Sequence, residues 1–187
     1  MAAHPSTEPP AMPRLLLPLL LCCSLLAHAA PPELDWLELM PPEDRQALED
    51  MPEIDHGGTE DPGFSAQGAL KQGAGLPAVM YSAKTVPALD GKPVRLGGYP
   101  VPLESDEQGR STLFFLVPYP GACIHVPPPP PNQIVLVRYP RGIQLDDIYT
   151  PLWVDGPLKI EKVSNELADA AYVIPADAVE PVDEADF

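Results

Sequence analysis

Apolar and polar residues alternate through much of the second half of the chain, the pattern of β-strands with one buried face. The first alternation runs from Val94 to Leu103 and slips by one position at Gly97–Gly98. Because successive side chains of a strand point to opposite faces, a slip at glycines predicts a β-bulge that bends this strand.

Four further segments have the composition of short strands, two of them almost entirely apolar: residues 113–119, 134–139, 152–160 and 171–174. Five short strands, the first of them bent, favour a small closed barrel. The predicted fold is therefore all-β, or β-rich α+β, with a small five-stranded OB-like barrel domain over residues 84–182.

Residues 31–51 predict an N-terminal helical segment. Pro42 suits the first turn of a helix, Glu43 and Asp44 complement its positive end, and Leu48 with Met51 forms an apolar i, i+3 pair. Just before this helix lies an apolar group that we expect to dock on the main domain, formed by Trp36, Leu37 and Met40.

Two segments have the composition of chain without a core of its own. Residues 52–83 are rich in Gly, Pro, Asp and Glu and predict a flexible acidic linker. Residues 183–187 form a short acidic tail.

The N-terminal residues 1–30 have the pattern of a secretory signal peptide. Arg14 precedes an apolar run, 15–26, which is shorter than the ~20 residues that cross a bilayer as a helix. The run ends in the small-x-small sequence of 27–30, which predicts cleavage near Ala29 or Ala30 and a periplasmic or secreted protein without a transmembrane segment. Translation starts at Met1 or at Met12.

Cleavage would leave Cys123 as the single cysteine, with His56 and His125 as the two imidazoles. A lone thiol in an oxidising compartment is buried, bound to metal, or reactive towards another molecule. The formal net charge of −16 argues against nucleic acid and anionic lipid as partners, since both need a positive surface. It is typical of a soluble protein, which we expect to be a monomer.

The chemistry of the chain is concentrated in residues 121–133, GACIHVPPPPPNQ. If Cys123 and His125 are on one strand, they point to the same face with Cα atoms about 6.5 Å apart. Zinc takes thiolate sulfur at about 2.3 Å and imidazole nitrogen at about 2.0 Å, so this pair can share one ion. A third ligand is open among His56, Glu104 and Asp155.

Two other interpretations of this pair stay open. Cys123 can be a small buried apolar residue while His125 donates to a backbone carbonyl and braces the prolines. A Cys–His pair can also serve as nucleophile and base, but no third orienting residue stands at a recognisable spacing. We therefore assign no catalytic residue, and an enzyme ranks last among the functions considered.

The five consecutive prolines, 127–131, predict a polyproline II strut about 15 Å long. An exposed strut is what aromatic grooves of partner proteins recognise, whereas a buried one would be a rigid loop on the barrel. Asn132 and Gln133 follow directly and can anchor its end through their amide donors.

The chain resembles a family of exported bacterial proteins, domain of unknown function 3299, over about residues 90–160, with a weaker similarity over residues 36–41. The resemblance rests on LGGYPVPLE (96–104), LVPYPG (116–121), GACIHVPPPPPNQ (121–133) and WVDG (153–156). It implies an association with metal-linked transport systems.

Two functions are therefore expected. The first is an exported periplasmic accessory or binding protein that holds a divalent metal such as zinc through Cys123 and His125, with His56 or Glu104 as further ligands, and serves an envelope transport system. The second is a metal-free module that docks an envelope partner through the polyproline strut.

Overall fold

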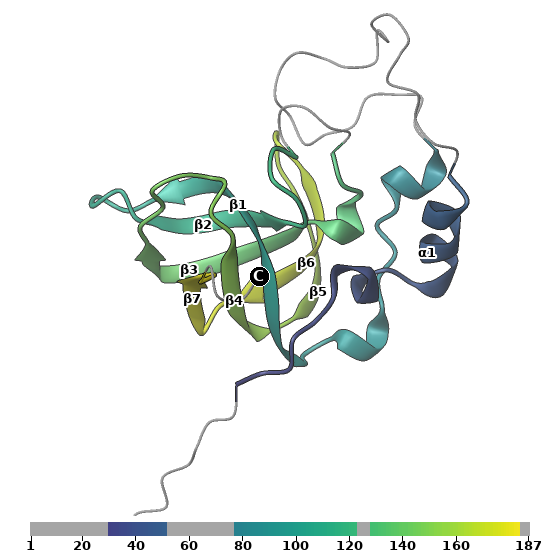
Figure 1. Ribbon diagram of the computed structural model, residues 1–187, viewed down its shortest axis with the longest axis horizontal. Helices are drawn as coiled ribbons and strands as arrows, with labels where there is room; N and C mark the ends of the chain where they lie inside the picture. Colours follow the sequence, from purple (N-terminus) through teal and green to yellow (C-terminus); the bar gives the residue numbers. More distant parts are fainter. Residues whose placement is uncertain (1–29, 52–76, 123–127, 184–187) are drawn as a thin grey trace, which may run out of the picture.

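The structure is a computed structural model that describes residues 30–51, 77–122 and 128–183 (Figure 1). The predicted signal peptide, apart from Ala30, and residues 184–187 of the predicted tail lie outside the described residues, as does most of the predicted linker. Within the described part of the chain, no helix is long and apolar enough to span a membrane.

Seven strands among the described residues form one sheet, in the order β5-β6-β3-β2-β1-β4-β7. Neighbouring strands are antiparallel except β3 and β6, which are parallel. The bounds are β1 Pro93–Ser105, β2 Ser111–Val117, β3 Val135–Ile143, β4 Leu152–Pro157, β5 Lys159–Ser164, β6 Asp169–Pro175 and β7 Ala178–Pro181. The strand-rich fold with an N-terminal helix is confirmed, whereas the five-stranded OB-like barrel is not.

Strand β1 changes partners at Gly97–Gly98. Residues 93–98 pair with β4, and residues 99–105 pair with β2. The side chains of β1 keep alternating through the change, so the predicted bulge at the two glycines is wrong. The apolar positions shift by one because the strand leaves one apolar cluster, which holds Val94 and Leu96, and joins a second one on the opposite face. The register irregularities of β1 lie later, around Glu104.

The two glycines are required by close approach of two tryptophans. A Cβ on Gly97 would lie 2.8 Å from the ring of Trp153, and a Cβ on Gly98 would lie 2.9 Å from the ring of Trp36 and 2.8 Å from the carbonyl oxygen of Val117. Any side chain at Gly98 would therefore push against backbone as well as against a ring.

The predicted fourth strand, 152–160, is two strands, β4 and β5, that are far apart in the sheet order. Leu158 lies between them and is fully buried. Its backbone bonds to residues 91–92 instead of continuing either strand: its N–H donates to the oxygen of Lys92 at 2.8 Å. The sheet is also strongly curved: the link between β6 and β7 donates to Arg138 of β3 at 2.9 Å and to Asp155 of β4 at 2.8 Å. Curvature thus brings together strands that are not neighbours in the order.

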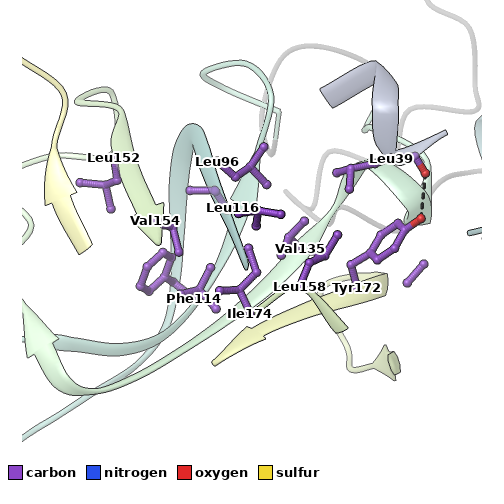
Figure 2. Close-up of a cluster of buried hydrophobic side chains, with 13 residues drawn as sticks. Leu39, Leu96, Phe114, Leu116, Val135, Leu152, Val154, Leu158, Tyr172 and Ile174 are labelled. Atoms are coloured by element: carbon purple, nitrogen blue, oxygen red, sulfur yellow. Dashed lines mark hydrogen bonds between the residues drawn. The ribbon is translucent and has the colours of Figure 1, made fainter. Parts of the chain in front are cut away.

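Each face of the sheet carries an apolar cluster. The main core gathers side chains from β1, β2, β3, β4 and β6 together with Leu39 from the N-terminal segment, as Figure 2 shows. The second cluster lies on the other face of β2, β3 and β6 and includes Phe115, Leu136 and Val173, with Ala122 beside them. Both faces of the central strands are therefore buried, which explains why β2 and β3 are nearly all apolar in sequence.

The N-terminal segment folds as predicted, as a short 3-10 helix η1, Trp36–Leu39, and a helix α1, Pro42–Glu49. Of the expected docking group, Trp36 packs against the main core and Met40 lies in a small separate cluster with Val79 and Met80. Leu37 is half exposed. The last part of the stretch predicted as a linker is also ordered: η2, Ala78–Tyr81, buries Val79 and Met80 against Met40. A third 3-10 turn, η3, Pro87–Leu89, leads into β1.

Candidate functional site

The proline-rich block connects β2 to β3, two neighbouring antiparallel strands, at one end of the sheet. Before it, Gly121 adopts a positive φ of 72° and Ala122 is buried in the second cluster. Within the block, Pro129 and Pro130 are buried, and Pro130 has the polyproline II angles φ −62° and ψ 156°. The described prolines therefore lie against the protein rather than forming an exposed strut.

Asn132 and Gln133 anchor the end of the block, as the sequence predicted, within the 3-10 turn η4, Pro131–Gln133. Both side chains are buried and both donate to segments that lie far away in sequence. The amide of Asn132 donates to Asp44 Oδ2 at 3.0 Å and to the carbonyl oxygen of Lys84 at 3.1 Å. The amide of Gln133 donates to the carbonyl oxygen of Trp36 at 2.6 Å. The block is thus held by the N-terminal segment.

Asp44 is the centre of this polar cluster. The residue is 4% exposed, and its carboxylate accepts hydrogen bonds from Ser82, from Lys84 Nζ at 3.0 Å and from Asn132. Burial raises the pKa of Asp44, but these hydrogen bonds and the charge of Lys84 outweigh burial and hold the pKa below its ordinary value of 3.8. The sequence predicts Asp44 only as a charge that complements the positive end of the helix, and the structure shows that it is also a buried ionic anchor.

Cys123, His125 and His56, which carry the predicted metal chemistry, lie outside the described residues. Two segments on either side of residues 52–76 bond to the end of the proline block. Asp44 of α1 accepts from the amide of Asn132, and the carbonyl oxygen of Ser82 accepts from the backbone N–H of Asn132 at 3.1 Å.

The other two predicted ligands are elsewhere. Glu104 is exposed near the β1–β2 turn and pairs with Leu113, about 13 Å along β2 from Val117, where the connection to the block begins. Asp155 lies on β4 in an ion pair with Arg95 at 3.0 Å. Burial raises the pKa of Asp155, and the nearby charge of Arg95 opposes that rise. Among the described residues, no group of three or more His, Cys, Asp or Glu is placed to hold a metal.

The fold and the block together define a class: a small, curved β-rich domain whose proline-rich connection is locked by an N-terminal helical segment. A family model described as "Protein of unknown function (DUF3299)" matches residues 36–181, and the chain belongs to this family. The match confirms the resemblance drawn from the sequence and extends well beyond residues 90–160.

The chain is similar to one solved structure in particular, the crystal structure at 2.45 Å resolution of a DUF3299 family protein from Pseudomonas aeruginosa PAO1. The two sequences are 39% identical, the comparison covers 83% of this chain and 98% of that chain, and the TM-score is 0.59. Among curated proteins, no match to the chain was found.

Proposed function

We propose that the protein is an exported periplasmic accessory protein that holds one divalent metal ion, zinc, through Cys123 and His125, with His56 as the third protein ligand, and that it serves an envelope transport system. The metal part of this proposal rests on the ligand types and on their i, i+2 spacing. Its link to transport rests on the family resemblance alone.

The observation that carries the proposal is the clamping of the block at both of its described ends. Ala122 is buried on one side, and Pro129, Pro130, Asn132 and Gln133 are buried on the other. A metal site needs ligands held by a rigid support, because every ligand that must be ordered on binding costs conformational entropy. We propose His56 rather than Glu104 as the third ligand because Glu104 lies at the turn end of the β1–β2 hairpin, away from the block.

The start of the described fold supports the export part of the proposal. The first contacts to the sheet come from Pro32 and Leu34, which bond to the backbone of Arg95 at 2.9 Å each. Signal-peptide cleavage near Ala29 or Ala30 would therefore remove no residue that makes these contacts.

The metal proposal is tested by native mass spectrometry of the mature protein purified from the periplasm without chelator. We expect about one zinc per chain, lost in Cys123→Ala and weakened in His56→Ala. Glu104→Gln is the matched control and should keep the metal, since Glu104 lies at the opposite end of the β1–β2 hairpin. A mature protein that carries no metal, and whose unfolding midpoint is the same with and without chelator, would refute the proposal.

Docking through the proline strut remains the second candidate function, but the burial of Pro129 and Pro130 leaves little of the described strut for a partner groove. Binding of an envelope protein that is abolished by replacing Pro128 and Pro131, the partly exposed prolines of the described run, and unaffected by Cys123→Ala, would favour this second function instead.

A further inference from the structure

The N-terminal arm, residues 30–51, lies on the body of the protein, residues 77–183, in the way that a bound peptide lies in a recognition groove. Its first part pairs with β1: Leu34 N donates to the oxygen of Arg95 and Arg95 N donates to the oxygen of Pro32, both at 2.9 Å. This parallel bridge between Glu33 and Arg95 is strand addition to an open edge, a common mode of peptide capture.

Two apolar side chains of the arm enter sites that are shaped for them. The ring of Trp36 covers Gly98, where any Cβ would collide with it, and its Nε1 donates to the oxygen of Gly97 at 2.6 Å. Leu39, three residues later on the same 3-10 turn, is fully buried in the main core. The spacing Trp-x-x-Leu thus supplies two anchors from one turn.

Polar side chains of the body bind the arm between and beyond these anchors. Gln133 donates to the carbonyl oxygen of Trp36. The hydroxyl of Tyr172 donates to the carbonyl oxygen of Leu39 at 2.9 Å, a bond drawn as a dashed line in Figure 2. Asn132 donates to the buried carboxylate of Asp44. Backbone pairing, two anchors and three polar contacts all come from the same stretch of the arm, residues 32–44.

We propose that the body carries a peptide-recognition groove, that residues 32–44 are its resident ligand, and that the same segment from a second copy of this chain can replace it. The contacts described above come from residues 32–44 of the arm, and the Gly- and Pro-rich residues 52–76 join the arm to the body in sequence. Exchange of such an element between copies is domain swapping, and the covalent connection favours the chain's own arm through its high effective concentration. This inference depends neither on metal nor on export.

The test uses the mature full chain with a protease site inserted between Gly57 and Gly58. After cutting, the arm should stay bound to the body during gel filtration. A fluorescent synthetic peptide of residues 31–51 in tenfold excess should then replace it, to about nine labelled arms per ten bodies, and unlabelled peptide should chase it out. A peptide carrying Trp36→Ala should bind at least tenfold more weakly, whereas Leu37→Ala, at a half-exposed position, should bind within twofold of the native peptide.

Three outcomes would overturn the proposal. Unfolding or precipitation on cutting would make the arm an integral part of the core rather than a ligand. A retained arm that is not replaced by the peptide over several days would exclude exchange. Equal loss of binding for the Trp36→Ala and Leu37→Ala peptides would exclude the assigned anchors.

Discussion

Asp44 is the residue on which the attachment of the arm to the proline block depends most. Asp44→Asn keeps the shape of the side chain but removes the charge that Ser82, Lys84 and Asn132 surround. We expect it to lower the free energy of unfolding by about 1.5–3 kcal/mol, the range for hydrogen bonds to a charged group. Urea unfolding followed by circular dichroism measures the change, and Glu49→Gln, an exposed acid of the same helix, should change stability by less than about 0.5 kcal/mol.

The difference in stability between wild type and Asp44→Asn depends on pH. The pKa of Asp44 is lower in the folded state than its ordinary value of 3.8, so its contribution is complete above that value. The contribution is lost as the pH falls through the lowered pKa. The stability difference between wild type and Asp44→Asn should thus be constant from pH 5 to 7 and shrink below about pH 4. A difference that persists unchanged at pH 2.5 would contradict an ionised Asp44.

Gly98 is a second residue whose identity is fixed by contact. Gly98→Ala places a methyl group within 2.9 Å of the Trp36 ring and within 2.8 Å of the carbonyl oxygen of Val117, and the backbone oxygen has little freedom to move. We expect a loss of about 1–3 kcal/mol, the usual cost of overpacking, measured by thermal and urea unfolding. Ser105→Ala, an exposed position of the same strand, is the control and should be close to neutral.

At the scale of elements, Tyr172 of β6 joins the sheet to two segments outside it, those of Leu39 and Val86. Its hydroxyl accepts from Val86 N at 2.7 Å and donates to the oxygen of Leu39, and the residue is fully buried. Tyr172→Phe leaves both backbone groups without this partner, and we expect a loss of about 1–3 kcal/mol. Tyr149→Phe, at an exposed ring, should leave the urea midpoint unchanged; equal effects would show that the hydroxyl of Tyr172 carries no stabilisation.

The elements also show how far the sequence predicts the fold. Strands, the helix starting at Pro42 and the anchoring role of Asn132 and Gln133 follow from local patterns and are confirmed. The sequence does not show that β1 changes from partner β4 to partner β2. A slip in the apolar alternation can come from a β-bulge or from a strand whose other face becomes buried, and both give the same sequence pattern. The break at Leu158 is hidden for a similar reason, since the alternation continues through it.

For the candidate site, the sequence indicates which residue types carry chemistry but not which ones meet. His56, Glu104 and Asp155 are open as third ligands in the sequence. The pairing of β1 with β2 places Glu104 away from the block, Asp155 is in an ion pair with Arg95, and His56 stays a prediction. The role of Asp44 is missed because an acid in the first turn of a helix already has a sufficient local explanation. Its partners Ser82 and Asn132 are distant in sequence, and no local signal connects them to it.

At the scale of the whole molecule, export can be measured directly. When the full-length chain is produced in a bacterium, we expect the periplasmic fraction to contain a protein whose intact mass begins at residue 30 or 31. Replacing Ala29 by arginine should block cleavage and retain the precursor, because signal peptidase needs a small residue there. A cytoplasmic protein that keeps Met1 or Met12 would contradict the proposed location.

The position of the proline block between β2 and β3 has a consequence for engineering. Two adjacent antiparallel strands need only a two-residue turn, yet the chain runs from Val117 to Val135 to make this connection. The pairing of the sheet alone would be satisfied by a far shorter hairpin, so the ends of this connection, the buried Ala122 and the mostly buried residues 129–133, serve packing and hydrogen bonding rather than strand pairing. A foreign loop could therefore be grafted between Ala122 and Pro129, provided that both ends are kept.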